Sequence, residues 1–576
     1  MAHFHVKKKN GRPYLYVREI ARVNGKPKVV NQIYIGSPDK VAKMAAGSLP
    51  QKETQLKVEE FGALWVANEM DRDIGLAAII DEVVPQDGRD KPPSVGDFFV
   101  YCVLNRMVQA RSKNRIAQWF ARTAVQQIRP VDIDQLTSQR FWEKWNRVSE
   151  SDLETIAGRF FAKVWEVEAP EAECLLFDTT NFYTFMASHT DSELVKRGHS
   201  KEGRHHLRQV GLGLLVGRQS RLPLHYRVFP GNQHDSKLFH SMMDDMFGVM
   251  CGLQKRKEQQ LTIVIDKGMN AKANYAAIDD HSQVHFVTTY STYFAEELAT
   301  TPLDKFGDIN IERNRRLDDE GRPDDRLLAF RTQGEYWGRQ RAVVVTHNPT
   351  TARKQSYTLD SKLLAIRHEL LEMRAKVRER KSQWRNAKTV RERYLRLCER
   401  FHLDADLYDI ELTRDSGQLT MSFHKDQYCV ERKKAAFGRN IIITDNLDWS
   451  TEDIVQTSLD RWQVEDRFRQ SKDEEMVCGR PVRHWTDSKI RCHLFTCVVA
   501  ITYLRRLELR LEEHGDKATA TSVMEEMRHL HSVLSIADGR SKPRRQIEEP
   551  TKIQSDVLAA LGHFVDPQGV LQPLGI

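Results

Sequence analysis

Two short apolar runs, each followed directly by an aspartate, constrain the fold of this chain most strongly. Residues 174–177 read Cys-Leu-Leu-Phe and precede Asp178, and residues 261–265 read Leu-Thr-Ile-Val-Ile and precede Asp266. Runs of this length and composition predict buried β-strands. Because α/β folds place their chemistry at strand ends, the pattern predicts an α/β domain with a polar site that contains both aspartates.

A third acid, Glu465, lies in a segment with helical periodicity. Four residues of this segment share one predicted helical face: Arg461, Glu465, Phe468 and Lys472. A carboxylate between two cations suits a site in which the carboxylate holds a metal ion while the cations hold phosphate oxygens. We therefore predict that Arg461 and Lys472 bind phosphate.

Three carboxylates on two strands and a helix can supply the ligands for two Mg²⁺ ions, which stand roughly 3.5–4 Å apart in enzymes that cut phosphodiester bonds. We predict that Asp178, Asp266 and Glu465 are the catalytic residues and the metal ligands, with two Mg²⁺ ions, or Mn²⁺ in their place, as cofactor. A strand-end aspartate taken alone is equally well interpreted as the cap of a turn. The three acids together favour a metal-dependent nuclease that acts on DNA.

Shifts in composition and periodicity divide the chain into six segments. The predicted organisation is a β-meander at residues 1–55, a helical DNA-binding region at 56–168, the first part of an α/β core at 169–299, an insertion domain with a long basic helical stretch at 300–446, the part of the core that carries the Glu465 helix at 447–510, and a helical tail at 511–576.

One basic surface is expected in the helical region, where no acidic residue occurs between Asp97 and Asp132. This gap contains Arg111, Lys113 and Arg115, which we predict to contact DNA phosphates. The alternative is a solvated helix face whose acidic partners lie elsewhere in the fold.

The insertion contains a second basic stretch, residues 353–400, with 15 Lys or Arg and 6 Asp or Glu. Its net charge of +9 exceeds the +8 of the whole chain. Apolar residues at helical spacing predict a narrow seam that packs against another helix: Leu363, Ile366, Leu370, Met373, Val377 and Trp384. The basic remainder fits a DNA-facing arm or a solvated helical hairpin equally well.

Composition argues against several other classes of protein. The eight cysteines form no Cys-x-x-Cys pair, which argues against a zinc ribbon and against a disulfide framework. The first residues lack the apolar region of a signal peptide, and the longest apolar run, residues 494–504, is too short to span a bilayer. We therefore expect a cytoplasmic protein without membrane contact.

These residues together resemble a known family, the DDE transposases of bacterial insertion sequences that carry a Tyr-Arg-Glu-Lys signature. Arg461, Glu465 and Lys472 match the spacing of that signature, whereas Ser458 stands at the tyrosine position. Residues 176–180 and 266–268 are similar to the segments around the family's two aspartates, although the aromatic residue that often follows the second is missing.

Residues 197–204 are similar to the family's Gly-x-Ser-Lys segment, and the resemblance implies phosphate contacts from Ser200, Lys201 and Arg204. It also implies an α/β ribonuclease-H-like catalytic core, a mixed sheet with helices, interrupted by a β-rich and helical insertion. The N-terminal β-meander, helical DNA-binding region and helical C-terminal tail would flank this core.

The resemblance implies an enzyme that cuts double-stranded DNA at the terminal inverted repeats of a mobile element and joins the 3′-OH ends to target DNA. A homodimer is expected in the synaptic complex, in the bacterial cytoplasm and associated with the nucleoid when bound to DNA. Two alternatives remain open. One is a ribonuclease-H-like structure-specific nuclease or resolvase, and the other is a domesticated, non-catalytic DNA-binding protein.

Overall fold

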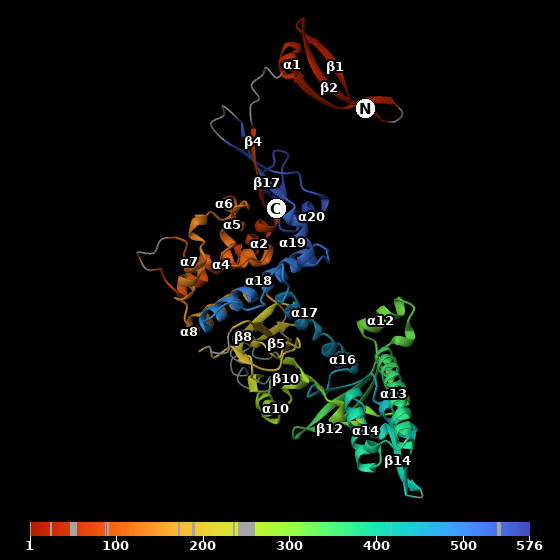
Figure 1. Ribbon diagram of the computed structural model, residues 1–576. Helices are drawn as coiled ribbons and strands as arrows, with labels where there is room; N and C mark the ends of the chain where they lie inside the picture. Colours follow the sequence, from red (N-terminus) through yellow and green to blue (C-terminus); the bar gives the residue numbers. More distant parts are fainter. Residues whose placement is uncertain are drawn as a thin grey trace. The chain divides into compact units, whose positions relative to one another are not determined.

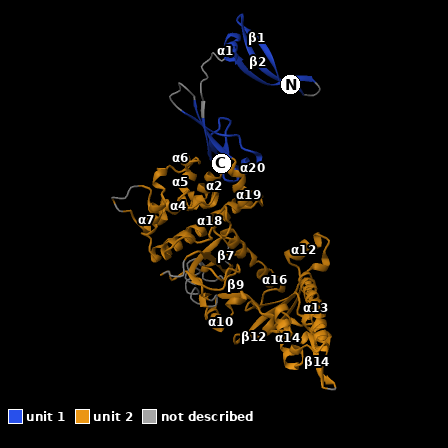
Figure 2. Ribbon diagram, in the orientation of Figure 1, with its two compact units in different colours: residues 1–61, 530–576 blue, residues 62–529 orange. Residues whose placement is uncertain are grey.

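The computed structural model (Figure 1) describes residues 2–23, 26–46, 54–86, 88, 92–170, 173–186, 191–233, 237–239, 260–415, 417–537 and 543–575. The chain divides into two compact units, which Figure 2 distinguishes by colour. Residues 1–61 and 530–576 form the smaller unit, and residues 62–529 form the larger one.

The smaller unit is built mainly from two antiparallel three-stranded sheets. The first is the predicted N-terminal meander, which is confirmed: β1 (Ala2–Lys9), β2 (Arg12–Val23) and β3 (Lys26–Gly36), followed by α1 (Pro38–Ala45). The second has the order β18-β17-β4. Its strands are β4 (Thr54–Glu60), β17 (His531–Ala537) and β18 (Arg544–Ile547). The unit is completed by α20 (Lys552–Ala560), β19 (His563–Val565) and β20 (Leu571–Pro573).

The prediction of a helical C-terminal tail was wrong for much of its length. Its described residues form α19 (Ala520–Arg528) and α20, but also the four strands β17 to β20. The predicted helical start near residue 56 was wrong for the same reason, because β4 occupies that segment and pairs with β17 in the register Ser532↔Glu59. β4 and β17 pair with each other from opposite ends of the chain, so local periodicity gives a weak signal for either strand.

The larger unit begins with a helical layer around one long buried helix, α18 (Asp487–Glu513). The layer contains α2 (Gly62–Arg72), α3 (Leu76–Val83), α4 (Val95–Val108), α5 (Ile116–Phe120), α6 (Val125–Ile128), α7 (Ser138–Trp145) and α8 (Glu150–Glu168), which confirms the predicted helical content from residue 62 onward. The apolar run at residues 494–504 is the buried centre of α18. Among the described residues, no helix is long and apolar enough to cross a lipid bilayer.

A large mixed sheet forms the second layer of this unit. Its strand order is β11-β12-β13-β16-β10-β9-β5-β7-β6, and β8 also pairs with β7. The strands β5, β9 and β10 are parallel, and the remaining pairs are antiparallel. The strands from the first half of the core are β5 (Cys174–Thr184), β6 (Lys196–Arg197), β7 (Arg208–Gly217), β8 (Pro223–Pro230), β9 (Leu261–Ile265) and β10 (Val284–Tyr290).

Residues 300–446 extend this same sheet and then leave it as an arm. The sheet strands are β11 (Gly307–Asp308), β12 (Leu328–Tyr336), β13 (Arg339–His347) and β16 (Arg439–Thr444), and β16 pairs directly with β10. The arm contains α13 (Pro349–Arg378), α14 (Ala387–Phe401), the hairpin of β14 (Tyr408–Asp415) and β15 (Gln418–Lys425), and α15 (Gln427–Ala435). The predicted apolar seam is buried in the arm's own core.

Candidate active site

The first two predicted acids are neighbours because their strands are parallel and adjacent. Leu176 on β5 pairs with Val264 on β9. The same register, continued by two residues, places Asp178 level with Asp266. Asp178 lies inside β5, not at its end as predicted, because β5 continues to Thr184 along β7 after β9 has ended at Ile265. Because β9 ends first, Asp178 has no β9 residue paired beside it. Asp266 caps the turn that follows β9.

The third acid approaches the same place from α17 (Trp462–Ser471), which follows α16 (Thr451–Leu459). Asp178, Asp266 and Glu465 all line one cleft of about 760 Å³. The predicted stripe on α17 is confirmed, because Arg461, Phe468 and Lys472 line this cleft as well. Further cations in the lining are Lys201, Arg469 and Arg480. Among the described residues, the lining of the cleft thus combines the three predicted carboxylates with five basic side chains and two further acids, Asp473 and Glu474.

Arg461 connects two of the three acids. Its guanidinium forms an ion pair with Asp266, and its Nη2 lies 3.4 Å from Oε1 of Glu465. More than half of the Glu465 side chain is exposed to the cleft, whereas Arg461 and Asp266 are each less than one third exposed. The guanidinium therefore supplies one positive charge between two carboxylates.

Asp178 is the most buried of the three acids. Its Oδ1 accepts the backbone N–H of Thr179 at 2.7 Å and lies 3.7 Å from Nζ of Lys201. Burial raises the pKa of Asp178, and the positive charge of Lys201 partly opposes that rise. Lys201 also donates to the backbone oxygen of Thr179 at 2.7 Å, so the strand that carries Asp178 holds this lysine in place.

Glu202 is a site residue that sequence reasoning missed. Its carboxylate lies 2.8 Å from Nζ of Lys472 and 2.5 Å from Nη1 of Arg480. Burial alone would raise the pKa of Glu202, but the two cations outweigh it and hold the pKa below its ordinary value. Glu202 is distant in sequence from Lys472 and Arg480, which lie at the end of α17 and after it. Only the tertiary contacts therefore reveal that Glu202 holds these two cations at the wall of the cleft.

The lining of the cleft fits a hard divalent cation in donor chemistry, because Mg²⁺ prefers carboxylate oxygens and keeps positions open for water and phosphate. Among the described residues, however, no three acidic, histidine or cysteine side chains gather closely enough to enclose an ion. Instead, Arg461 lies against Asp266 and Glu465, and Lys201 lies near Asp178.

The remaining predicted contacts lie outside this cleft. Ser200 is buried, and its Oγ accepts the backbone N–H groups of Glu202 at 3.3 Å and Arg204 at 3.1 Å. The guanidinium of Arg204 lies over the ring of Tyr183, 4.3 Å from its centroid. Arg115 precedes α5 and lines neither large pocket. Arg111 and Lys113 line a second pocket.

Comparison with known proteins places this geometry in a family. The transposase DDE domain matches the chain over residues 170–503, which is 334 of 576 residues. No curated protein matches the chain. Among solved structures, the cryo-EM structure of a piggyBac transposase synaptic complex with hairpin DNA is similar with a TM-score of 0.37 and 7% identity over 82% of each chain. The assignment rests on the family match.

That match covers more than half of the chain and contains Asp178, Asp266 and Glu465, which line the cleft. The mixed α/β architecture with its large mixed sheet fits a transposase catalytic core. Members of this family act on DNA in recombination and transposition. The chain belongs to the family of transposases with a DDE domain.

Proposed function

We propose that this transposase cuts DNA at the terminal inverted repeats of a bacterial insertion sequence and joins the resulting 3′-OH ends to target DNA. The observation that carries the proposal is the cleft in which Asp178, Asp266 and Glu465 meet among basic side chains. The spacing of Arg461, Glu465 and Lys472 supports the group with the Tyr-Arg-Glu-Lys signature.

A ribonuclease-H-like core is part of this proposal. The strand order β8-β7-β5-β9-β10, with β7 antiparallel to a parallel β5-β9-β10 set, supports it. So does the placement of one acid on the central strand, one after its parallel neighbour and one on a later helix. In this arrangement the insertion enters after β10 and returns through β16, which leads through α16 into α17, the helix that carries Glu465.

Asp178, Asp266 and Glu465 would hold two Mg²⁺ ions, or Mn²⁺ ions in their place. When bound, such ions stabilise both the attacking and the leaving oxygen of a phosphodiester. The protein's own part is to place the strand. Lys472 and Arg480, held by Glu202, stand where charge-assisted donors can fix phosphate oxygens beside the acids. Lys201 and Arg461 supply further positive charge at the acids themselves.

The chemistry then needs no covalent enzyme intermediate. Water attacks the phosphorus at the element end, a new P–O bond forms, and the 3′-oxygen leaves. That 3′-OH next attacks a phosphodiester of the target, forming one P–O bond as another breaks. Two element ends must be held together for joining, so we propose a homodimer in the synaptic complex. It would act on the DNA of the bacterial cytoplasm, associated with the nucleoid.

Strand cleavage in Mg²⁺ on the gene with its natural flanks tests the proposal, with wild type compared with Asp178→Ala. The expected result is cutting at the boundaries of inverted repeats by wild type alone. Cutting of branched DNA at no fixed sequence would replace transposition with a structure-specific nuclease. Binding of the flanks without any cutting would point to a domesticated DNA-binding protein.

A further inference from the structure

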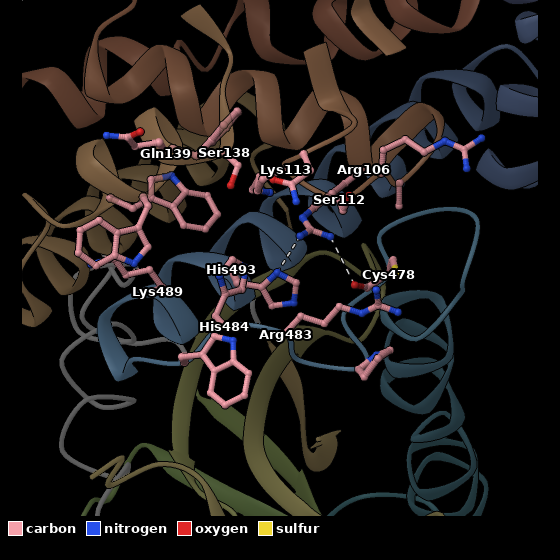
Figure 3. A pocket seen from close by; sticks show the side chains of 18 residues that line it. Arg106, Ser112, Lys113, Ser138, Gln139, Cys478, Arg483, His484, Lys489 and His493 are labelled. Atoms are coloured by element: carbon pink, nitrogen blue, oxygen red, sulfur yellow. Dashed lines mark hydrogen bonds between the residues drawn. The ribbon is translucent and has the colours of Figure 1, made fainter. Parts of the chain in front are cut away.

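A second pocket of about 800 Å³ lies in the larger unit, apart from the three acids (Figure 3). Its walls come from the segment after α4, from α7, from residues 478–485 and from the start of α18. Pockets that enclose a single small ligand have volumes of this order. The cavity is therefore large enough for one nucleotide and too small for a duplex.

The lining of this pocket is basic, and none of the described residues in it is an aspartate or glutamate. Arg106 is occupied inside the protein, where it donates to Nδ1 of His493 at 2.7 Å (Figure 3) and to Oγ1 of Thr496 at 3.1 Å. Arg111 and Arg483 are exposed, and within the described part of the chain no carboxylate forms an ion pair with either. Two guanidinium groups at a rim without counter-charge favour an anionic ligand.

Aromatic rings form the other part of the lining. Trp142 and Trp485 leave 53% and 68% of their surface exposed, which is high for tryptophan. Trp145 is only 1% exposed, yet its indole N–H has no hydrogen-bond acceptor among the described residues. A buried N–H without an acceptor is costly, so a ligand that supplies an oxygen or ring nitrogen would relieve that cost.

The two histidines of the pocket add no charge. Burial, reinforced by nearby Lys113 and Arg106, lowers the pKa of His484 to about 3 and lowers the pKa of His493 as well. His493 uses both ring nitrogens inside the protein, because Nδ1 accepts from Arg106 and Nε2 lies 3.1 Å from the backbone oxygen of Gly479. Of the two, His484 is the neutral imidazole that can offer a ring nitrogen to the polar edge of a base.

One segment connects this pocket to the catalytic cleft. Arg480 lines the cleft, and Pro481 and Arg483 line the pocket. Between these residues, the backbone N–H of Val482 donates to the backbone oxygen of Tyr183 at 2.9 Å. Tyr183 belongs to β5, the strand that carries Asp178. A DNA strand that leaves the acids beside Arg480 would meet the next basic side chain of this segment, Arg483, at the second pocket.

We propose that this pocket binds one unpaired nucleotide of the DNA strand, with its base stacked on the exposed tryptophans and its phosphate on Arg111 and Arg483. The inference rests on the proposed function, since the ligand is DNA. Duplex DNA offers its phosphates to surface cations but keeps its bases stacked, so the exposed indole faces would have no partner. A base outside the stack gains stacking on an indole without regard to its sequence.

Binding of a fluorescently labelled oligothymidylate of about ten nucleotides, compared with a duplex of equal length, tests the proposal. Trp485→Ala should weaken oligothymidylate binding about tenfold while changing duplex binding less than about twofold. Trp485→Phe should restore most of the loss, because a phenyl ring still stacks. Trp462→Ala is the matched control, since Trp462 is also half exposed but lies beneath Arg221 and lines neither pocket.

Equal affinity of wild type and Trp485→Ala for the oligothymidylate would overturn the proposal, as would an equal loss on single strand and duplex. Both results leave the proposed function intact if the wild-type protein still cuts at inverted repeats. Conversely, a Trp485-dependent preference for single strands in a protein that cuts no DNA would support the pocket and overturn transposition. Because Trp485 is largely exposed, an unchanged melting temperature confirms that each variant is folded.

Discussion

Arg461, immediately before α17, forms an ion pair with Asp266 at the end of β9, although 195 positions separate them in the chain. The same guanidinium reaches Glu465 one helical turn later. One arginine thus occupies the space between two of the three predicted metal ligands. This relationship links metal affinity, the placement of DNA and the position of α17.

Removal of this arginine should tighten metal binding while it reduces cutting. Arg461→Ala removes a positive charge that competes with a divalent ion, so we expect the Kd for Mn²⁺ to fall about tenfold, measured by isothermal titration calorimetry. Arg469→Ala is the control, because Arg469 lies on the same helix but pairs with Asp466. A weaker Mn²⁺ affinity in Arg461→Ala would show that the arginine organises the acids instead of competing with the ion.

Glu465 should be needed for cutting but not for DNA binding. Glu465→Gln removes a metal ligand and no cation, so cleavage should fall by at least about a thousandfold while the Kd for the element end stays within about threefold. Glu474→Gln provides a matched control, since Glu474 is an exposed acid of the same cleft outside the triad. Loss of binding together with cutting would contradict the assignment.

Lys472 should contribute to DNA affinity through its charge. Lys472→Ala removes one predicted phosphate contact, so the slope of log Kobs against log salt should become shallower by about 0.9 for duplex DNA. Glu202 keeps its partner Arg480 in this variant, which protects the cleft wall. Filter binding over a range of salt concentrations measures the slope. An unchanged slope would show that Lys472 makes no phosphate contact and serves only as the ion-pair partner of Glu202.

The contact between His285 on β10 and Asp445 after β16 should make stability depend on pH. His285 Nδ1 lies 3.0 Å from Oδ2 of Asp445, and that hydrogen bond raises the pKa of His285 above 6.5. A raised folded-state pKa stabilises the protein fully below the unfolded value, and the contribution is lost as pH rises through the folded value.

Asp445→Asn should therefore destabilise the larger unit by about 1–2 kcal/mol near pH 6, with a smaller difference near pH 8, as measured by urea unfolding. Asp409→Asn is the control, because the contact between Asp409 and His424 is 3.6 Å long and mostly exposed. A difference that is constant across this pH range would exclude a role for the histidine charge.

Gly198 should be required for the close approach of the Lys201 segment to the sheet. A Cβ at this position would overlap the carbonyl oxygen of Gly231, so Gly198→Ala should lower stability by about 1–3 kcal/mol. Gly158→Ala in α8 should instead raise stability by about 0.5–1 kcal/mol, since nothing lies near its Cβ and alanine favours a helix. Thermal melting of the two variants compares these opposite signs.

Local patterns in the sequence were sufficient for the main strands of the core and for the helical face that carries Arg461, Glu465 and Lys472. The runs before Asp178 and Asp266 are strands, and the stripe of Arg461, Glu465 and Lys472 faces one cleft. Both predictions follow from the spacing of apolar and charged residues along the sequence, because a strand or helix that buries one face repeats its apolar residues at a fixed period. The catalytic roles of these residues stay predictions.

Contacts between distant segments were decided by the tertiary structure. The pairing of β4 with β17 and the ion pairs of Glu202 bring together residues whose own neighbours in sequence carry no sign of the partner. The same holds for the tryptophan-lined pocket built from α7 and the segment before α18. Periodicity encodes which face of an element is buried, but which element covers it depends on the packing and the hydrogen bonds of the whole fold.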